Sequence, residues 1–222
     1  MAASSGMCQT RARNWEEPLA EPKRTRIQTE NRKVILAAAL EVFSRDGFRG
    51  ATVDAIARAA GMSKPNLLYY FPKKDDIYRA LLEGLLDDWL DPLREMDAEG
   101  DPIREVAAYL ERKIELARDF PMESRLFANE MIRGAPILME VIESDLKPLV
   151  DEKAAVLRGW MREGRLARTD PHHLIFAIWA TTQHYADFDP QVRTVLGNDG
   201  EGRFSDAATA LKQIFLDGLK PR

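Results

Sequence analysis

The chain of 222 residues has a single cysteine, Cys8, so no disulfide bond can form within it. Such cysteine usage is typical of proteins from reducing compartments. The sequence also has no run of about 18 apolar residues, the length that a membrane-spanning helix requires. Its first residues lack the apolar segment of a secretory signal. We therefore expect a cytoplasmic protein with no membrane contact.

The residue patterns of common enzymes are missing too. The chain has 3 histidines and contains no Ser-His-Asp order, no glycine-rich phosphate loop and no cysteine pair. Asp170, His172 and His173 suggest a metal site at first sight, but adjacent side chains at the start of a helix diverge, and a solvated first turn explains them as well. We expect no catalytic residue, no metal site and no cofactor.

Charge is distributed unevenly along the chain. Residues 1–80 contain 14 Lys and Arg against 9 Asp and Glu, whereas the remainder contains 18 against 27. A basic N-terminal part on an acidic body suits a local phosphate-binding surface on a scaffold that is not itself a polycation. Chance unevenness would give the same counts.

Residues 51–76 predict a helix-turn-helix followed by a third helix. Thr52 is a good N-cap for a first short helix, because its hydroxyl accepts a hydrogen bond from a first-turn amide. Gly61 suits the left-handed residue that ends such a helix. Ser63 caps a second helix, Pro65 lies in its first turn, where a missing N–H costs nothing, and the following Phe-Pro pair stops it. An ordinary helical hairpin with a solvated polar face would show a similar pattern.

The rest of the chain also predicts helices. Apolar residues at helical spacing cover 29–46, 73–91, 102–118, 122–132, 172–188 and 205–219, and a long helix kinked at Pro148 ends at Gly164. No strand pattern is visible, so the predicted fold class is all-α: an N-terminal three-helix helix-turn-helix domain followed by a larger helical ligand-binding and dimerisation domain. We predict a disordered tail at 1–28, the DNA-binding domain at 29–72 and the effector-binding domain at 73–222. Basic side chains of the tail can follow a phosphate backbone or enter a minor groove, although they also suit a solvated tail; they are Arg11, Arg13, Lys23, Arg24 and Arg26.

The second helix of the helix-turn-helix carries side chains of the kind that meet DNA. Lys64 suits a phosphate or a guanine edge, Asn66 can read a base edge, and the tyrosine pair that follows offers hydroxyls to phosphates and ring faces to thymine methyl groups. Lys73 and Lys74 open the next helix, where ammonium groups and free amides can hold a phosphate. The candidate DNA-binding residues are Thr52, Ser63, Lys64, Pro65, Asn66, Tyr69, Tyr70, Lys73 and Lys74.

The string G-x-S-K-x-x-L-x-Y-Y-F-x-x-K at residues 61–74, with Thr-x-x-x-Ile-Ala before it, resembles the N-terminal domain of the TetR family of transcriptional regulators. The similarity runs from 34 to 77 without a gap. It implies that Thr52, the first residues of the recognition helix, Tyr69 and Lys74 contact operator DNA. Pro65 departs from the small residues usual at its position, so no base preference is carried over.

Polar groups inside the apolar body form a second candidate site. Trp179 and Gln183 lie four residues apart and hence on one helix face. A carboxamide offers a donor beside an acceptor, which matches the lactam edge of a small heterocycle, and an indole supplies a flat wall for stacking. Trp89 suits a second wall, although core tryptophans and a backbone-bonded Gln183 would need no ligand. The candidate ligand-binding residues are Trp89, Leu90, Asn129, Trp179, Thr182 and Gln183.

Most of residues 64–192 resembles a narrower group within the family, the regulators of pyrimidine utilisation. The strings SRLFANEM and DPHHLIFAIWATTQHYADFDPQV, at 124–131 and 170–192, carry much of this similarity. The resemblance implies a dimer that senses uracil or thymine and leaves its operator when the base binds. Residues 1–30 and those after about 195 fit poorly, so nothing is carried over there.

The segments 171–188 and 205–219 have apolar residues on more than one face. An antiparallel pair of such helices can meet its copy in a four-helix bundle, and the dimer would set two recognition helices about 34 Å apart on a palindrome. A monomer with two unusually buried helices is the alternative.

We therefore expect a homodimeric repressor that binds double-stranded operator DNA and is released by uracil or thymine. The alternatives are the same architecture with another aromatic or drug-like effector, and a DNA-binding protein with no ligand. The helix 73–91 is the expected carrier of the signal, because Lys73 and Lys74 mark its DNA end and Trp89 its inner end.

Overall fold

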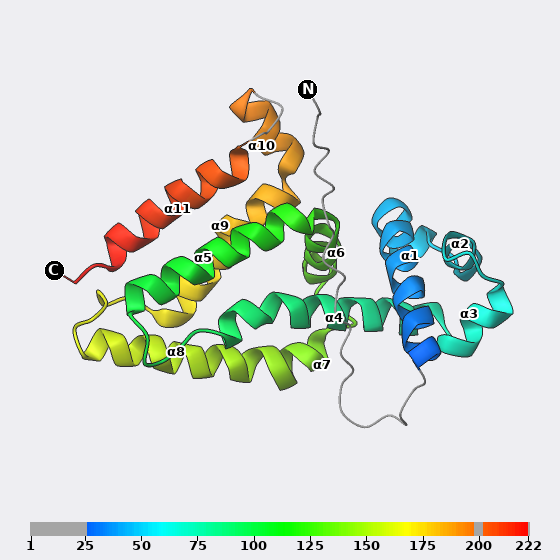
Figure 1. The fold of residues 1–222 in the computed structure, drawn as a ribbon, viewed down its shortest axis with the longest axis horizontal. Coiled ribbons are helices and arrows are strands. Elements are labelled where there is room, and N and C mark those ends of the chain that lie inside the picture. The colour runs from blue at the N-terminus through cyan, green and yellow to red at the C-terminus, as the bar shows by residue number, and fades with distance from the viewer. Residues whose placement is uncertain (1–25, 198–201, 222) are drawn as a thin grey trace, which may run out of the picture.

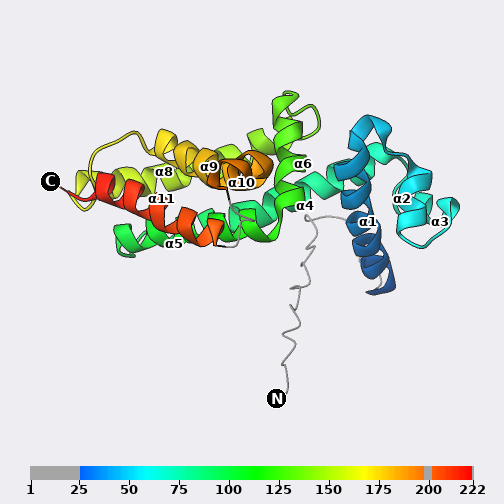
Figure 2. The same ribbon diagram turned by 90° about the horizontal axis from the view of Figure 1, so that it is seen from above.

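The computed structural model describes residues 26–197 and 202–221, which form helices and the turns between them, with no strand (Figure 1). Helices α1 (Arg26–Gly50), α2 (Val53–Ala59) and α3 (Lys64–Tyr70) form a small unit at one end of the molecule. Helix α4 (Lys74–Arg94) leaves this unit and runs into a larger helical body (Figures 1 and 2). The predicted all-α fold class is confirmed. In these residues no helix combines the length and the apolar character needed to cross a membrane.

The body is built around α5, which contacts α4, α9 and α11. Helix α6 contacts α9 on one side and α1 of the small unit on the other, so it bridges the two parts of the chain. Helix α8 packs on α4 and α9. The bounds are α5 (Pro102–Asp119), α6 (Pro121–Ile132), α7 (Met139–Val141), the π-helical turn η1 (Ile142–Leu146), α8 (Lys147–Arg162), α9 (Pro171–Asp187), α10 (Asp189–Leu196) and α11 (Arg203–Leu219).

The boundaries of the helix-turn-helix follow from its capping residues. The Thr52 hydroxyl accepts a hydrogen bond from the Ala55 amide at 3.1 Å and begins α2. Gly61, at φ 68°, makes the left-handed turn that an L side chain would resist. The Ser63 hydroxyl then accepts from the Asn66 amide at 3.4 Å and begins α3. The predicted caps of both helices are confirmed.

Two hydrophobic cores meet along α4. The DNA-domain core joins buried residues of α1–α3 to the first half of α4, from Ile77 to Leu85, and is completed by Leu126, Ala135 and Leu138 from α6 and the segment after it. The body core takes Leu93 from the last turn of the same helix. Helix α4 therefore belongs to both cores, and the DNA-binding unit packs directly on α6.

Two predicted helix bounds were wrong. Helix α1 begins at Arg26, inside the predicted tail, and Gly47 breaks it at φ 67° before its last turn. Helix α4 passes through Pro92 to Arg94 rather than ending at 91. Arg94 stabilises this last turn by donating to the Asp87 carbonyl at 3.1 Å and pairing with the Asp91 carboxylate at 2.7 Å.

The C-terminal part also differs from the prediction. The pair Asp189-Pro190 begins a separate helix, α10, which the sequence reading treated as the end of α9. Helix α11 begins at Arg203, and Ser205 lies inside it with its hydroxyl donating to the Gly202 carbonyl at 2.7 Å. Pro148 occupies the first turn of α8, and the predicted irregularity of the long helix is the π-helical turn η1 just before it.

Candidate functional site

Helix α3 presents its polar face to solvent at the outer end of the molecule (Figure 1). Leu67 is fully buried and anchors the helix on the DNA-domain core. The other face is accessible, which is the arrangement that a recognition helix needs. Its exposed residues are Ser63, Lys64, Pro65, Asn66 and Tyr69.

The first turns of α1 brace the tyrosine pair of α3. Gln28 Nε2 donates to the Tyr69 hydroxyl oxygen at 3.1 Å, and Asn31 Nδ2 donates to the Tyr70 hydroxyl oxygen at 2.7 Å. Arg32 donates to the Tyr70 carbonyl at 3.0 Å. Because both hydroxyl oxygens act as acceptors here, their hydrogens can still be donated to a phosphate. These three hydrogen bonds were not predicted from the sequence, where their only local signal is polar residues one turn apart.

Lys64 is already engaged in an ion pair. Its Nζ lies 2.8 Å from Asp54 Oδ2, between helices α3 and α2, and both side chains are about half exposed. The Lys64 ammonium lowers the pKa of Asp54 through this hydrogen bond. Exposed pairs of this kind contribute little to stability, so a DNA phosphate can compete for the ammonium.

Lys73 and Lys74, predicted as a phosphate anchor, have different surroundings. The Lys73 side chain is exposed, and its backbone amide donates to Asp76 Oδ2 at 2.9 Å, so that amide is not free for a phosphate. The Lys74 Nζ points inward and donates to the carbonyls of Phe48 at 2.6 Å and Ala51 at 2.9 Å. Lys74 therefore ties the start of α4 to the α1–α2 connection, and its DNA contact stays a prediction. The tail residues Arg11, Arg13, Lys23 and Arg24 lie outside the described residues, and Arg26 is exposed in α1.

A group of polar and aromatic side chains lies inside the body, where α4, α5, α6 and α9 come together. Trp179 Nε1 donates to the Tyr109 hydroxyl at 2.5 Å and links α9 to α5. Burial raises the pKa of Tyr109 well above its ordinary value, so this hydroxyl stays neutral. We call the group the interior polar cluster; it comprises Trp89, Tyr109, Lys113, Ser124, Trp179 and Asp187.

Lys113 and Asp187 supply the charges of the interior polar cluster. The Lys113 Nζ lies 4.4 Å above the centre of the Trp89 ring. Burial lowers the pKa of Lys113 to about 7, although the Asp187 carboxylate opposes this shift. Burial raises the pKa of Asp187, although the hydrogen bond from Ser124 opposes it. Each charge is therefore held in surroundings that favour its neutral form more than water does.

The predicted ligand-binding residues divide into three groups. Trp89 and Trp179 belong to the interior polar cluster, and Gln183 lies on the same face of α9 with no hydrogen-bond partner in the described part of the chain. Leu90 and Thr182 are buried, but the Thr182 hydroxyl donates to the Ile178 carbonyl at 2.7 Å within its own helix. Asn129 is exposed on α6, and the structure does not bring it together with the cluster.

The sequence reading missed Tyr109, Lys113, Ser124 and Asp187. Lys113 had a visible signal, because it follows Tyr109 by one helical turn on the apolar stripe of α5. A lysine on such a stripe is either bent towards solvent or functional. Ser124 and Asp187 join the cluster through contacts between distant helices, for which the local sequence carries no signal.

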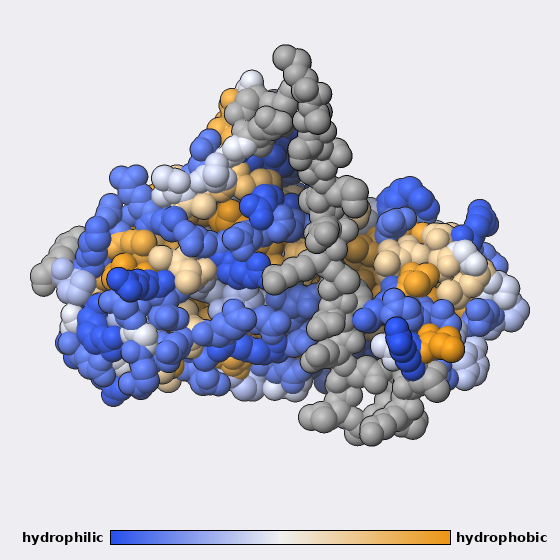
Figure 3. Space-filling view, viewed as in Figure 1, coloured by the Kyte–Doolittle hydropathy of each residue, from blue (hydrophilic) through white to orange (hydrophobic). Residues whose placement is uncertain are grey.

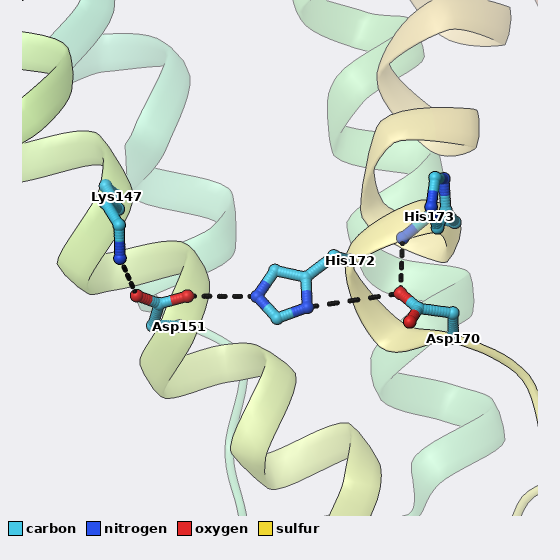
Figure 4. Close-up of polar contacts among 5 residues, drawn as sticks. All are labelled: Lys147, Asp151, Asp170, His172 and His173. Carbon is cyan, nitrogen blue, oxygen red and sulfur yellow. Dashed lines mark hydrogen bonds and ion pairs between the residues drawn. The ribbon is translucent and has the colours of Figure 1, made fainter.

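His172 and His173 diverge, as expected for neighbours at a helix start (Figure 4). His172 Nε2 lies 3.0 Å from Asp151 Oδ1 of α8, while its Nδ1 lies 4.0 Å from Asp170. His173 contributes its backbone amide to Asp170 at 3.0 Å, and its ring turns aside. Within residues 26–197 and 202–221, no group of three or more His, Cys, Asp or Glu could hold a metal ion.

Helices α9 and α11, at the predicted dimer segments 171–188 and 205–219, run next to each other on the side that faces the viewer in Figure 2. Both carry exposed apolar side chains, among them Phe176 on α9 and Ile214 on α11. Figure 3 shows hydrophobic residues along α11 and near α10, and others over the unit of α1–α3, with hydrophilic residues between them. The small residues Ala180 and Ala210 are exposed on the same two helices, which allows close approach of another helix.

A buried carboxylate links the body to the DNA-domain core. Glu130 of α6 is fully buried, and its Oε1 accepts a hydrogen bond from the Ile137 amide at 2.7 Å. Its Oε2 accepts from the Tyr78 hydroxyl at 3.4 Å, and the Tyr78 ring packs on Phe43 of α1 at 4.9 Å between centroids. Burial and the Glu130 carboxylate raise the pKa of Tyr78 to about 12. A continuous set of contacts therefore runs from α6 through α4 to α1.

Two family models match the chain. One is described as bacterial regulatory proteins of the tetR family and matches residues 35–81. The other is described as the C-terminal region of YcdC-like proteins and matches residues 82–222. The two matches meet within α4, which contributes to both hydrophobic cores.

Known proteins agree with these matches. The chain is 47% identical over 202 residues to the HTH-type transcriptional regulator RutR of Escherichia coli, which covers 90% of this chain and 95% of that protein. It is 23% identical over 193 residues to the biofilm operon regulator IcaR of Staphylococcus epidermidis, covering 82% of this chain and 97% of that one.

Solved structures have the same fold. The ketosteroid regulator KstR2 of Mycobacterium tuberculosis superposes with a TM-score of 0.68 at 20% identity, covering 90% of this chain and 98% of that one. Salmonella enterica GusR superposes with a TM-score of 0.64 at 21% identity, covering the same shares. The matched families and the sequence relatives are transcriptional regulators rather than enzymes. The chain therefore belongs to the TetR family of DNA-binding transcriptional regulators.

Proposed function

We propose that this regulator is a repressor that binds palindromic operator DNA as a homodimer and is released when uracil or thymine binds in the interior polar cluster. The observation that carries the effector assignment is the Gln183 carboxamide, which lies one turn from Trp179 and has no hydrogen-bond partner among the described residues. A donor and an acceptor side by side match the lactam edge of a pyrimidine base. The resemblance of residues 170–192 to regulators of pyrimidine utilisation supports the same choice.

The state of Gln183 also weighs against a DNA-binding protein without a ligand. A half-buried carboxamide that bonds to no protein group leaves its donor and acceptor open to a ligand, whereas permanent packing usually satisfies such a group by an internal hydrogen bond. Thr182, its neighbour, makes such an internal bond to the Ile178 carbonyl. The contrast between the two neighbours supports a site that is completed by a small molecule.

DNA contact is proposed for the exposed side of α3 and the residues around it. Asn66, which is exposed on α3, can read base edges in a major groove, and Lys64 and the two tyrosine hydroxyls can hold phosphates. Phosphate contacts fix the register of the protein, whereas base contacts give it sequence preference. Thr52 can donate its hydroxyl hydrogen to a phosphate while its hydroxyl oxygen accepts the capping hydrogen bond of α2.

The proposed route of the signal is α4, supported by α6. Helix α4 carries Trp89 at its body end and Lys74 at its DNA end, where two backbone carbonyls hold the ammonium. Glu130 gives a second connection from α6 to Tyr78 on α4. A ligand shifts an equilibrium only through its different affinity for the two arrangements, so uracil must fit better where α4 holds the two recognition helices at the wrong spacing.

The proposed dimer uses α9 and α11, which would meet their copies in a four-helix bundle. The exposed apolar residues Phe176 and Ile214 on these helices support this choice, because isolated exposed apolar patches on monomers are usually small. The two-fold axis of such a dimer matches the symmetry of a palindromic operator.

A thermal-shift screen of nucleobases tests the effector assignment. A ligand that binds only the folded state raises the melting temperature of the protein. At a free ligand concentration of about one hundred times Kd, the free energy of unfolding increases by about 2.7 kcal/mol. We expect uracil or thymine to raise the melting temperature and the variants Trp179→Ala and Gln183→Ala to lose most of the shift. If a different aromatic compound gives the shift, the architecture stands with another effector. A protein that no nucleobase stabilises would contradict the pyrimidine assignment.

A further inference from the structure

The body contains two buried lysines that differ in how their ammonium groups are satisfied. Lys153 of α8 is 8% exposed; its Nζ donates to the Met96 carbonyl at 3.2 Å and lies 3.1 Å from Glu152 Oε1. Lys113 of α5 is 4% exposed, and its Nζ has no hydrogen-bond acceptor in residues 26–197 and 202–221. Lys153 therefore has the surroundings of a structural lysine, whereas Lys113 does not.

The surroundings of Lys113 stabilise its charge only weakly. The Trp89 ring, 4.4 Å away, offers a π face, and the Asp187 carboxylate of α9 attracts the ammonium from a distance beyond a salt bridge. Asp187 is itself occupied by the Ser124 hydroxyl at 2.5 Å. Lys113 is only 4% exposed, so little water reaches its amine, and a ligand oxygen at this place would supply the acceptor that the protein does not.

Lys113 and Gln183 lie on two helices that pack against each other. Helices α5 and α9 are in contact, with Tyr109 paired to Trp179 and Lys113 facing Asp187. Tyr109 precedes Lys113 in α5, and their partners Trp179 and Asp187 follow the same order in α9, so the two helices run parallel. Gln183 lies one turn after Trp179 and one turn before Asp187, on the same face of α9 as the residues that meet α5. The unpartnered carboxamide and the unpartnered amine therefore approach the same interior region from facing helices.

We propose that Lys113 is the specificity-determining residue of the effector site and donates a hydrogen bond from Nζ to a ring carbonyl oxygen of the bound heterocycle. The site then accepts planar rings with an oxo group at that position and rejects rings with an amino group there. This assignment rests on the proposed pyrimidine effector and names the group that selects it.

The chemistry of the amine explains the selection. Lys113 donates hydrogen bonds in both of its protonation states, and its charged form has no lone pair to accept one. An oxo group supplies the acceptor that the Lys113 amine lacks, whereas an amino group would meet the ammonium donor to donor. A site built to hydrogen-bond one group discriminates strongly against an analogue that leaves its polar atom unpaired. Gln183 alone cannot discriminate in this way, because a carboxamide can turn over and exchange its donor and acceptor.

Calorimetric titrations of the full-length protein with uracil and with cytosine test this assignment. The variants are Lys113→Met, which keeps the length of the side chain, and Lys153→Met as the matched buried-lysine control. We expect Lys113→Met to bind uracil about 10- to 100-fold more weakly, the range for a lost hydrogen bond to a charged group. Its affinity for cytosine should change little, so the preference for uracil collapses. The control should keep the uracil affinity and the preference of the wild type.

Melting temperatures without ligand provide a second readout with opposite signs. Lys113→Met should melt above the wild type because an unsatisfied amine is removed, and Lys153→Met should melt below it because a satisfied one is lost. Uracil binding by Lys113→Met within about threefold of the wild type, or a lowered melting temperature with unchanged uracil affinity, would overturn the role of Lys113 and leave the effector assignment intact. A wild-type protein that binds neither uracil nor thymine would instead overturn the effector assignment itself.

Discussion

Replacing Lys113 by methionine should stabilise the protein by an amount that depends on pH. Burial lowers the pKa of this amine from 10.5 to about 7, and the side chain is only 4% exposed, so solvent screening reduces the effect little. At about 1.4 kcal/mol per pKa unit, the difference corresponds to roughly 5 kcal/mol. This is an upper bound, because the Trp89 ring favours the ammonium and a methionine sulfur replaces only part of that contact.

The sign follows from proton binding in the two states. Between about pH 7 and pH 10 the unfolded chain keeps the proton of Lys113 and the folded protein loses it, so the free energy of unfolding of the wild type rises with pH. Below about pH 7 both states are protonated and the full cost remains. The advantage of Lys113→Met should therefore be largest near pH 7 and shrink by roughly 2–3 kcal/mol towards about pH 9.

Urea unfolding followed by circular dichroism, at one protein concentration and at several pH values, measures this difference. Asp187 on α9 acts on Lys113, Arg125 and His184 act on Asp187, and Tyr109 lies one turn away on α5; all of these groups occur in both proteins. Their titration therefore cancels except where it is coupled to Lys113. Lys153→Met, measured under the same conditions, is the control for loss of a buried lysine. A stabilisation by Lys113→Met that does not change between about pH 7 and pH 9 would refute the reasoning.

Three further changes test other parts of the structure. Lys74→Met leaves two backbone carbonyls without a donor and should lower the free energy of unfolding, measured in urea, by roughly 2–4 kcal/mol, with weaker binding to all DNA. Lys73→Ala, at an exposed side chain, should keep the wild-type stability and lower the salt slope of DNA binding by about 1. Equal stabilities of the two variants would contradict the role of Lys74 in holding the start of α4. Ile214→Glu, at a side chain that is 68% exposed, should give monomers in light scattering with little loss of helicity, and a persistent dimer would exclude this face. Glu130→Leu leaves the Ile137 amide and the Tyr78 hydroxyl without their acceptor and should lower the free energy of unfolding by about 1–3 kcal/mol. Tyr78→Phe removes one long hydrogen bond and should lower it clearly less. Equal losses in the two variants would count against the link through Glu130.

Local signals in the sequence predicted the helix-turn-helix well. Thr52 and Ser63 cap their helices by bonding amides three residues ahead, and Gly61 turns the chain by its own backbone freedom. Such interactions involve neighbours in the chain, so they can be read without knowledge of the fold. The same holds for the helical stripes of the body, whose spacing predicts which faces are buried.

Some signals were ambiguous because one pattern fits two structures. An Asp-Pro pair begins α9 at Asp170, and a second pair begins α10 at Asp189, although Asp-Pro also ends a preceding helix. Pro92 suggested the end of α4, yet the missing amide falls in the final turn, where Arg94 supports the chain.

Contacts between distant segments could not be predicted from the sequence. Lys74 was read as a phosphate ligand from its place at a helix start, but the carbonyls that hold it come from residues 23 and 26 positions away. The burial of Lys113 was not predicted, because it depends on the packing of α4 and α9 against α5. In both cases the residue type was informative, and its role depended on the packing of other helices.

The affinity for operator DNA with and without uracil tests the central claim most directly. A duplex selected by the protein from a random pool serves as the operator, and fluorescence anisotropy measures its Kd for the full-length wild type. We predict that saturating uracil weakens this binding at least about fivefold, the lower end of ordinary coupling between two sites, and that Lys113→Met needs far more uracil for the same release. An operator affinity that saturating uracil and thymine leave unchanged would contradict the account.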